Sequence, residues 1–560
     1  MSNTRKSSGQ RRSLKIVPLG GLHEIGKNMT AIEYGNDILV IDCGMSFPED
    51  DMFGIDVVIP DFTYLIENAK KIRGIIVTHG HEDHIGAIPY LEKQIDVPVW
   101  ATKLPLGLIK YKLEEHGLNR RLHPFEAGDI IRLGPFTVET IRVTHSIADS
   151  VCLCIDTPVG RIFHSGDFKV DFTPVDGEPI DLGRLAEIGR KGVLLMMCES
   201  TNALRPGFSK SERVVGNTLE TIFRETKNRI IIATFSSNVH RIQKIIDIAA
   251  KSRRKVAVSG MSMEKIVTLA SELGYLKIPK NVLIDVNDAK NIPDRHLVII
   301  TTGSQGEPMS ALARMAQNEH KAIKITKNDT IVLSSNAIPG NEKLVANIVN
   351  SLTELGAKVI YSDIAETHVS GHACQEELKL MHSLIKPKFF MPVHGEFRHL
   401  RAHADLALEL GMKESNIFLM ENGQQLKVTS RRAQILDEKV PADAVMVDGL
   451  GVGDVGEIVM RDRRLLSESG LIIVVATIDG ATGEVVSGPD LVSRGFVYVR
   501  ENESLMEEAK SIAGSALERC AENNIRDWNA MKGALRNDLR KYIFETTGRR
   551  PVILPIFMEV

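Results

Sequence analysis

The sequence predicts an α/β protein with a strand-rich first domain, a second α/β domain inserted into it, and a small α/β domain at the C-terminal end. Three observations lead to this prediction. Short β-rich runs dominate residues 16–210, helical segments alternate with buried strands over 211–371, and the metal-binding residue types of the first part return at 372–432. A chain of 560 residues is also too long for one hydrophobic core, because single cores rarely extend beyond about 250–300 residues.

The strand-rich domain is expected over residues 16–210, after a basic, polar segment at residues 1–15. That segment has no apolar core and is interpreted as a disordered tail, with a weak RNA-contacting arm as the alternative. Apolar and β-branched runs that end in turn residues predict strands. These strands are expected at 14–21, 29–44, 72–80, 136–146, 151–167 and 192–200, and helices at 90–94 and 103–117.

The inserted domain is expected over residues 211–371, where helical segments such as 211–227 and 238–252 alternate with buried strands. That alternation is typical of βαβ units around a parallel sheet. Residues 372–432 then complete the first domain, and a linker rich in small residues follows at 433–455. The last domain, 456–560, is expected to have strands at 471–479, 495–500 and 551–560 and helices at 503–522 and 527–546.

Composition excludes several classes of protein. Hydrophobic and charged contents of 43% and 25% are ordinary for a globular protein, and no apolar stretch reaches the roughly 18 residues that cross a bilayer, so no membrane association is expected. A net charge of −3 argues against a whole-surface nucleic-acid binder but leaves room for a local basic groove. Six dispersed cysteines are too few for a disulfide framework, and Cys152 and Cys154 are interpreted as core residues. A reducing, cytoplasmic setting is therefore expected.

A metal-binding motif stands where one apolar run ends. The stretch "THGHEDHIGA" follows "GIIV" and contains His79, His81, Asp83 and His84. Two histidines at i and i+2 on a loop can bind one ion, and the Asp-His pair beyond can bind a second about 3.5–4 Å away, as in two-metal hydrolases. Neutral imidazole and carboxylate ligands suit zinc, or manganese in a more oxygen-rich site. Each ion lowers the pKa of bound water toward about 7, so hydroxide becomes available at neutral pH.

Further ligands must come from other strand ends, because one loop cannot complete two coordination spheres. His145 in "VTHS", Asp167 in "HSGD" and His394 in "MPVHGE" each follow an apolar run. Each of them alone would be read equally well as a turn residue, but together with the first motif the set indicates a binuclear metal site. His164 lies close to Asp167 in the sequence and is expected to support a ligand rather than to bind metal.

These residues resemble the signature of the metallo-β-lactamase superfamily, and the insertion narrows the resemblance to the β-CASP nucleases. Three further motifs of that group have matches: Glu199 in "CESTN", His372 in "HVSGHA" and His394 in "PVHGE". A histidine at the third motif is typical of the members that act on RNA. The resemblance implies an αββα sandwich with an inserted β-CASP α/β domain and a small C-terminal α/β domain that contributes to oligomer contacts.

Nearly the whole chain is similar to the bacterial ribonuclease J family. The matching stretches include "FPEDDMFGIDVVIPD", "GHEDHIGAIPY", "TGSQGEPM", "SGPDLVSRGFVYVR" and "RRPVILPIFMEV". Two departures are visible. His23 stands where glycine is usual in "GGLGEIGKN", and Glu199 stands where many members have aspartate, which keeps the carboxylate. Some paralogues have lost metal ligands, whereas this chain keeps the full set and so resembles a catalytic member.

The resemblance implies two zinc ions per subunit, with manganese or magnesium as alternatives. One ion would be held by His79, His81, His145 and Asp167, and the other by Asp83, His84, Asp167 and His394. A metal-activated hydroxide beside the bridging Asp167 would attack the scissile phosphate in line. His372 would protonate the leaving 3′ oxygen or stabilise its charge, and Glu199 would orient His372 or a liganding histidine. The expected catalytic residues are therefore Asp83, Glu199 and His372.

The resemblance also implies an activity and a set of partners. The expected activity is 5′-to-3′ exonuclease and endonuclease cleavage of single-stranded RNA, with roles in mRNA decay and ribosomal RNA maturation. Expected partners, besides RNA, are further copies of the chain in a homodimer or homotetramer, a paralogous subunit and an RNA degradation complex.

A pocket for a 5′ monophosphate is predicted beside the metals. The stretch that motivates it consists of His368, Val369, Ser370, Gly371 and His372. Glycine lets the backbone approach an anion, the serine hydroxyl can donate a hydrogen bond, and the N–H groups at the start of the following helix attract phosphate. Ser304 and Gln305 in "TGSQGEP" are expected to face this stretch across the cleft. The alternative is that both stretches are ordinary Gly-rich turns between a strand and a helix.

Two other functions stay open at this stage. A thioester or lactam hydrolase would use the same metal loop, but it does not need a second domain of about 150 residues to clamp a polymer. The third interpretation is a non-enzymatic scaffold that binds RNA and other nucleases, which the complete ligand set disfavours. An assay for chelator-sensitive cleavage of labelled RNA separates the scaffold from the ribonuclease.

Overall fold

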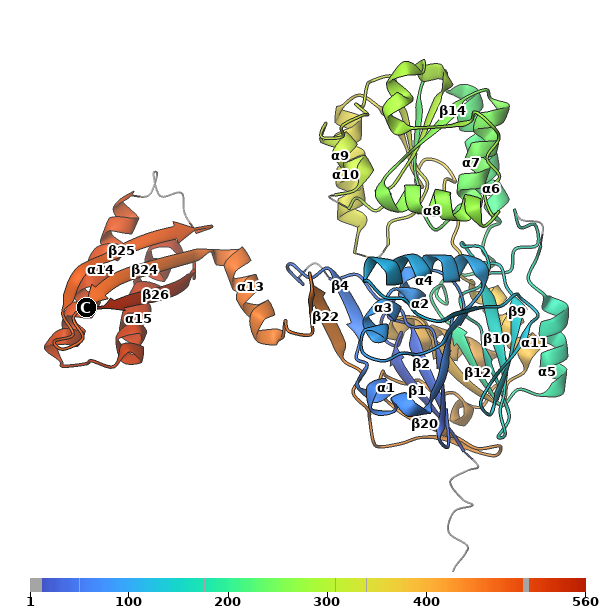
Figure 1. Ribbon diagram of the computed structural model, residues 1–560, viewed down its shortest axis with the longest axis horizontal. Coiled ribbons are helices and arrows are strands. Elements are labelled where there is room, and N and C mark those ends of the chain that lie inside the picture. Colours follow the sequence, from blue (N-terminus) through green and yellow to red (C-terminus); the bar gives the residue numbers. More distant parts are fainter. Residues whose placement is uncertain (1–12, 50, 176–177, 308, 339, 497–502) are drawn as a thin grey trace, which may run out of the picture. The chain divides into compact units, whose positions relative to one another are not determined.

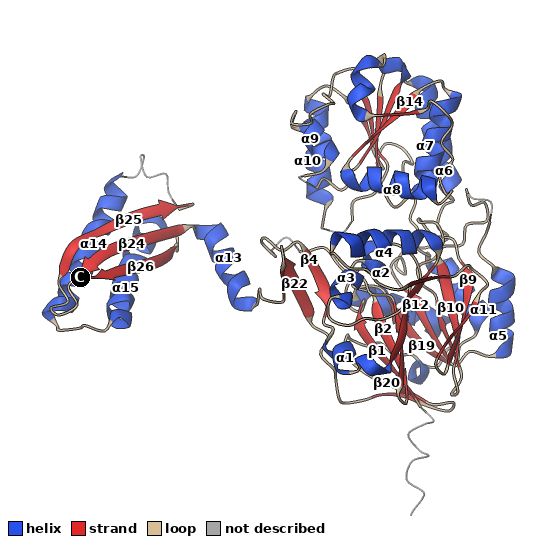
Figure 2. Cartoon of the chain, in the orientation of Figure 1, coloured by secondary structure: helices blue, strands red, loops and turns tan. Residues whose placement is uncertain are grey.

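The computed structural model describes residues 13–49, 51–175, 178–307, 309–338, 340–496 and 503–560. The chain divides into two compact units, one made of Met1–Phe47 and Val57–Val445 and the other of Pro48–Asp56 and Met446–Val560. Figures 1 and 2 show the helices and strands of each unit. The predicted basic tail lies almost entirely outside the described residues. None of the described helices combines the length and the apolar character needed to span a bilayer.

Two sheets face each other in the first unit. One has the order β21-β20-β1-β2-β3-β5-β6-β7 and the other the order β19-β12-β11-β10-β9-β8. The strands of the first sheet are β1 (Leu14–Gly20), β2 (Met29–Tyr34), β3 (Asp37–Ile41), β5 (Ile72–Ile76), β6 (Val99–Ala101), β7 (Leu122–Pro124), β20 (Leu426–Val428) and β21 (Ala433–Ile435). Those of the second are β8 (Ile130–Leu133), β9 (Phe136–Arg142), β10 (Val151–Asp156), β11 (Arg161–His164), β12 (Leu195–Glu199) and β19 (Phe389–Val393).

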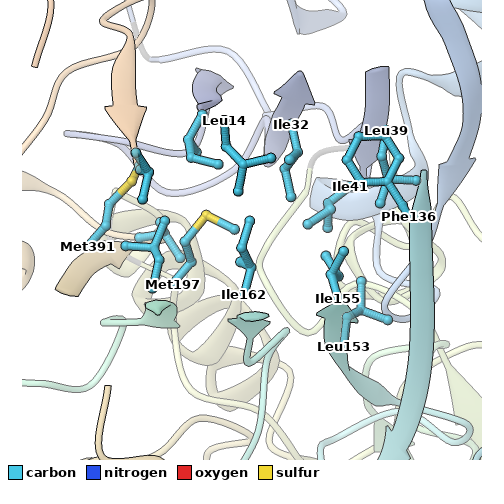
Figure 3. Close-up of a cluster of buried hydrophobic side chains, with 14 of the residues drawn as sticks. Leu14, Ile32, Leu39, Ile41, Phe136, Leu153, Ile155, Ile162, Met197 and Met391 are labelled. Atoms are coloured by element: carbon cyan, nitrogen blue, oxygen red, sulfur yellow. The ribbon is translucent and has the colours of Figure 1, made fainter. Parts of the chain in front are cut away.

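The main core lies between these sheets. Figure 3 shows Leu14 and Ile32 of the first sheet opposite Ile162 and Met197 of the second, and all four are buried. Successive residues of a strand face opposite sides, so the outer sides of both sheets need a second cover. Helices supply it. The second sheet is covered by α5 (Leu182–Lys191), α11 (Gln375–Ile385) and α12 (Phe397–Glu409), and α3 (Ile88–Glu92) and α4 (Lys103–Glu115) lie on the other side of the sandwich. The predicted αββα sandwich is confirmed.

The inserted domain is a parallel sheet with helices on both faces. Its strand order is β15-β14-β16-β13-β17-β18, and every neighbouring pair is parallel. The strands are β13 (Ile230–Ala233), β14 (Lys255–Ser259), β15 (Leu283–Ile284), β16 (Leu297–Thr301), β17 (Thr330–Leu333) and β18 (Lys358–Ile360). The main helices are α6 (Glu212–Glu225), α7 (Val239–Lys251), α8 (Met261–Glu272), α9 (Ala311–Ala316) and α10 (Glu342–Glu354). Two separate hydrophobic clusters line the two faces of this sheet.

The insertion leaves and re-enters the sandwich at neighbouring strands. The chain departs after β12 and returns at β19, and these two strands pair in parallel from Leu195–Phe389 to Glu199–Val393. The ends of both strands therefore lie side by side at one edge of the second sheet, although 189 residues lie between the two strands in the sequence.

The second unit is a three-stranded sheet backed by two long helices. Strands β25 (Val485–Arg494), β24 (Leu471–Ile478) and β26 (Val552–Glu559) pair in that order, and α13 (Glu457–Ser469) precedes β24. Helices α14 (Glu503–Glu522) and α15 (Trp528–Thr547) pack on one face of the sheet around a shared apolar cluster. The predicted helices of this unit are confirmed within one residue at each end.

Two details differ from the sequence-based expectation. The strand predicted at 495–500 falls mostly outside the described residues, and the described strand is β25, just before it. The predicted linker at 433–455 contains β21 and the antiparallel pair β22 (Ala444–Asp448) and β23 (Gly451–Val452). Val447 of β22 pairs with Val452 of β23 on either side of a turn at Gly449, which has φ 57°. The exact domain boundaries stay a prediction.

Candidate metal centre

The structure brings all seven predicted ligands together at one edge of the sandwich. Five of them follow the ends of four strands, and the other two lie in a short helix, α2 (Glu82–Ile85). His79 and His81 follow β5, Asp83 and His84 lie in α2, His145 follows β9, Asp167 follows β11 and His394 follows β19. Their nitrogen and oxygen atoms form two groups, and within each group all ligand atoms lie within 4.8 Å of one another.

The first group is an imidazole trio. His79 Nε2 and His145 Nε2 each lie 3.1 Å from His81 Nδ1. Burial lowers the pKa of His81 to about 4 and holds the pKa values of His79 and His145 well below the usual range. Three neutral imidazoles with nitrogens this close are the arrangement that binds zinc.

The second group combines two carboxylates with two histidines. Asp167 Oδ1 lies 2.8 Å from His394 Nδ1, and Asp167 Oδ2 lies 3.3 Å from His84 Nε2. Asp83 Oδ2 lies 3.3 Å from His394 Nε2. Burial alone would raise the pKa of both carboxyls, but the charges of the two histidines hold these pKa values below the usual range.

Protons on the histidines balance the carboxylates of this group. Burial acts to lower the pKa of His394, but Asp167 and Asp83 raise it to about 10, and the pKa of His84 is raised in the same way. A divalent cation between the carboxylates would take over the role of these protons, so cation binding is coupled to proton release.

Two buried atoms fit a bound cation directly. Asp167 Oδ2 and His394 Nε2 are buried and form no hydrogen bond. Unpaired buried polar atoms are costly and rare in native proteins. Both atoms belong to the second group, and Asp167 Oδ2 is also 3.6 Å from His79 Nε2 of the first group. The donor set, histidine nitrogens with carboxylate oxygens, suits zinc.

Asp42 lies behind both ligand groups, although nothing in the sequence singles it out. Its Oδ1 accepts a hydrogen bond from Thr78 N at 2.7 Å, and its Oδ2 accepts one from His84 Nδ1 at 2.8 Å. Thr78 Oγ1 donates to the same oxygen at 2.9 Å and lies 3.0 Å from His79 Nδ1. These bonds leave the Nε2 atoms of His79 and His84 facing the other members of the two ligand groups. The available signal, its place directly after β3 where an apolar run ends in a carboxylate, is too weak by itself.

Other neighbours orient the remaining ligands. His145 Nδ1 donates to the carbonyl oxygen of Gly371 at 2.7 Å, which leaves Nε2 for an ion. A Cβ on Gly371 would lie within 2.8 Å of Ser146 and of the His145 ring, so only glycine fits there. His164 Nδ1 accepts a hydrogen bond from Gly166 N at 3.0 Å, in the turn that leads to Asp167. Its supporting role stays a prediction.

Buried Glu199 and half-buried His372 form a pair next to both groups. His372 Nδ1 lies 2.8 Å from Glu199 Oε2 and 3.7 Å from Asp167 Oδ2. Glu199 Oε1 accepts a hydrogen bond from Phe168 N at 2.8 Å, which fixes the carboxylate. Burial acts to lower the pKa of His372, but the Glu199 carboxylate raises it above its usual value. The Glu199 carboxylate thus favours the protonated form of the imidazole.

The stretch 368–371 contains two polar side chains, and cationic residues lie near His368. Ser370 Oγ accepts hydrogen bonds from Asn202 Nδ2 at 2.8 Å and from His372 N at 3.3 Å, so its own hydrogen is available to a further acceptor. Arg241 Nη1 lies 3.2 Å from His368 Nδ1. Burial and the Arg241 charge lower the pKa of His368 to about 3. Val369, by contrast, is buried in the core of the inserted domain.

Ser304 and Gln305 are occupied within the inserted domain. Both are 3% exposed. The Gln305 side chain donates to Ser335 Oγ and to the carbonyl of Asn336, and it accepts from Ile338 N at 2.7 Å. Ser304 offers its carbonyl to Ser335 Oγ. In the described part of the chain no hydrogen bond or ion pair joins either side chain to the stretch 368–372, so their substrate role stays a prediction.

Comparisons with known proteins define the class first. A model of the metallo-beta-lactamase superfamily matches residues 24–191, and a model of the Zn-dependent metallo-hydrolase RNA specificity domain matches residues 357–419. A solved structure of a protein of unknown function from Enterococcus faecalis V583 superposes with a TM-score of 0.52 and 17% identity, covering 74% of this chain and all of its own. That likeness shows the fold alone. Fold and site together define a metallohydrolase of this superfamily.

Two further models are specific to one family. They are the Ribonuclease J beta-CASP domain, at residues 227–352, and the Ribonuclease J C-terminal domain, at residues 458–560. The chain is 45% identical to Ribonuclease J 1 of Streptococcus pyogenes over 97% of both chains. It is also 45% identical to Ribonuclease J2 of Bacillus subtilis, over 98% of this chain and 99% of that protein. The chain belongs to the ribonuclease J family and is a hydrolase of the ribonuclease type.

Proposed function

We propose that the chain cleaves single-stranded RNA with two divalent cations, as a 5′-to-3′ exonuclease and an endonuclease that prefers 5′ monophosphate ends. The observation that carries this proposal is the position of the His372–Glu199 pair, 3.7 Å from the carboxylate that the two ligand groups share. A proton donor at that distance can serve a phosphodiester bound at the centre. Family membership and the RNA specificity domain at residues 357–419 support RNA as the substrate.

The ligand groups assign the ions to residues. His79, His81, His145 and Asp167 would hold one, and Asp83, His84, Asp167 and His394 the other. When bound, the ions would supply hydroxide at neutral pH and offset the charge that develops on the phosphoryl oxygens. Zinc suits the donor set best, with manganese or magnesium as alternatives.

The side chains around the ions complete the chemistry. His372 donates a proton to the leaving 3′ oxygen, because its pKa is raised and its Nδ1 is already bonded to Glu199. Glu199 orients His372 and cannot shift easily, because Phe168 N holds its other oxygen. Asp42 orients the His84 ring directly and the His79 ring through the hydroxyl of Thr78. Asp83 is placed to assist as the carboxylate nearest to solvent, with 29% of its side chain exposed.

Removing the ions should abolish cleavage. We expect purified protein to lose ribonuclease activity in excess chelator and to regain it when Zn²⁺ or Mn²⁺ is added back, because hydroxide formation at neutral pH depends on the ions. The measurement is cleavage of a labelled single-stranded RNA on a denaturing gel. Cleavage that persists in chelator would contradict the metal dependence, and no cleavage after either ion is restored would favour the scaffold interpretation.

A 5′ monophosphate would be read by the stretch 368–371. The Ser370 hydroxyl is free to donate, and His368 has its Nδ1 turned toward Arg241, which leaves its Nε2–H for an anion. The charges of Arg241, Lys169 and Arg205 lie close enough to His368 to lower its pKa, so the local potential favours phosphate. A triphosphate is larger and more charged and would fit poorly.

The rate of exonuclease digestion should depend on the 5′ end. We expect the intact protein to digest 5′-monophosphorylated RNA faster than the same RNA with a triphosphate or hydroxyl. Ser370→Ala should reduce that advantage about 10-fold or more, since a hydrogen bond to a charged group is worth roughly 1.5–3 kcal/mol. Ser370→Thr, which keeps the hydroxyl, serves as the matched control. Equal rates on all three ends in the intact protein would rule out the pocket.

The second unit is proposed to hold protomers together. The face of its sheet opposite α14 and α15 exposes apolar side chains from β25 and β26. These are Val492, Leu554, Ile556 and Met558, between 41% and 50% exposed. Alternate residues on the same strands pack against the helices, so the exposed set forms one apolar face. Burying such a face against a second copy would give a homodimer, or a homotetramer if a further surface takes part.

Charging this face should break the assembly. We expect a Leu554→Glu, Ile556→Glu double variant to sediment as a smaller species than the intact protein, because two carboxylates would be buried unpaired at the contact. A truncation near residue 450 should do the same and also lose activity. Phe544→Glu, on the helical face, is the matched control. An unchanged sedimentation mass in the double variant would contradict the proposal.

The cellular roles that we propose are mRNA decay and ribosomal RNA maturation in the cytoplasm, with a paralogous subunit or a degradation complex as further partners. All six cysteines are unpaired and buried, which suits a reducing setting.

A further inference from the structure

Three buried polar side chains behind the metal centre form a chain of contacts that the proposed chemistry does not use. Ser200 Oγ lies 3.0 Å from His403 Nδ1, and His403 Nε2 lies 3.2 Å from His382 Nε2. His403 is fully buried and His382 is 6% exposed. The two histidines belong to α12 and α11, whereas Ser200 directly follows β12. The contacts therefore tie both covering helices to the end of a central strand.

Both histidines are neutral, which makes these contacts a consistent hydrogen-bond chain. Burial lowers the pKa of His382 to about 4 and that of His403 well below its usual value. A neutral imidazole has one N–H and one acceptor nitrogen, so donation in a single direction satisfies both contacts. The ring of Phe390 packs against both imidazoles, with centroid distances of 4.5 Å and 4.8 Å. The chain is thus held rigidly in an apolar setting.

Ser200 connects this chain to a predicted metal ligand in an unfavourable backbone conformation. His394 has φ 54°, in the left-handed region that side chains other than glycine rarely adopt. Its carbonyl oxygen accepts hydrogen bonds from Ser200 N at 3.3 Å and from Thr201 Oγ1 at 3.4 Å. Such conformations persist only where the surroundings fix them. The end of β12, with Ser200, supplies that support.

We propose that Ser200, His403 and His382 brace the left-handed backbone of His394 and thereby set the affinity of one of the two ion sites. The inference rests on the proposed function, because it concerns the ion held by Asp83, His84, Asp167 and His394. The three are positioning residues. If His403 no longer fixed the buried hydroxyl of Ser200, the turn after β12 would relax, and with it the carbonyl contact that holds His394.

Three variants separate this role from a general effect on stability. His403→Leu and Ser200→Ala remove the contact between the helix and the turn. His403→Asn keeps an amide donor near the position of Nδ1 and should rescue in part. His320→Leu is the matched control, because Ser259 Oγ and His320 Nε2 make a similar contact at 2.9 Å in the inserted domain.

The test is a calorimetric titration of chelator-stripped full-length protein with Zn²⁺. The binding event that disappears in His394→Ala identifies the second site. We expect His403→Leu and Ser200→Ala to weaken that event about 10–100-fold, the usual effect of losing a residue that orients a ligand, and to leave the other event unchanged. His320→Leu should bind both ions as the intact protein does. His403→Asn keeps the contact with Ser200 but loses the one with His382, so it should recover part of the lost affinity.

Three outcomes would overturn the inference. They are unchanged affinities, an equal weakening of both events that tracks a lower melting temperature, and a failure of His403→Asn to restore any of what His403→Leu loses. If His403→Leu does not fold, the Zn²⁺ affinity of Ser200→Ala at the second site tests the inference. If the intact protein bound no Zn²⁺, Mn²⁺ or Mg²⁺, the proposed function itself would fail, and that result is distinct from the other three.

Discussion

Replacing Asp167 by alanine is expected to abolish RNA cleavage while the chain stays folded. Asp167 Oδ1 and Oδ2 lie within 3.6 Å of His394, His84 and His79, so a single side chain serves both ligand groups. Its loss should lower the rate by about 10³-fold or more, because the activated hydroxide and the charge compensation disappear together. Elemental analysis should show fewer than two ions per chain.

A buried carboxylate elsewhere provides the control for this variant. Asp329 is 1% exposed and pairs with Arg229 at 2.6 Å inside the inserted domain. Asp329→Ala should lower the melting temperature, since it leaves a charged partner buried and unpaired, but should keep both ions. Full activity in Asp167→Ala would remove the basis of the metal assignment.

His372→Ala is expected to slow turnover by about 10²–10⁴-fold, the usual contribution of a positioned general acid, with little change in ion content. The ring lies 2.8 Å from Glu199 and forms no part of the two main ligand groups, although it belongs to a third set with His145 and Asp167. Comparing single-turnover rates with ion content tests the two roles. Loss of an ion in parallel with activity would make His372 a ligand and not a proton donor.

The pH dependence gives a second measurement of the same role. Burial opposes protonation of His372, but Glu199 raises its pKa, so the intact enzyme keeps the acid form to higher pH than a free histidine would. Glu199→Gln removes that charge. Its activity should therefore decline at a lower pH on the alkaline side, while the acid side of the profile stays in place. If the alkaline limb of the profile did not move, Glu199 would not control the protonation of His372 during cleavage.

The sequence indicates which residues gather at the candidate metal centre, because each of them follows a buried run. His145, Asp167 and His394 are polar residues directly after buried runs, and strand ends of one sandwich meet at a common edge. Asp42 obeys the same rule, yet a single aspartate after a strand has no partner in the sequence that marks it out. The contact between His403 and His382 could not be predicted from the sequence either, because the two histidines lie on separate helices and meet only when these helices pack.

The fold shows a similar limit. Helices α14 and α15 were predicted within one residue, because long amphipathic runs between polar caps have few alternatives. Strand β25 was not predicted, since Gly488, Pro489 and Asp490 interrupt its alternation. Pairing with β24 overrides these local preferences, and such long-range pairing cannot be read from a short window.

The parallel pairing of β12 with β19 has a consequence for how such an enzyme could arise. Main-chain contacts close the sandwich directly between these strands, so a compact ancestor without the excursion would keep both ligand groups. It would lack His372, which lies on the returning segment before β19. A single gene insertion at this point would therefore add a polymer-sized accessory domain together with His372, the proton donor that we propose. Swapping that domain at the same point is the natural route to a hydrolase with altered specificity.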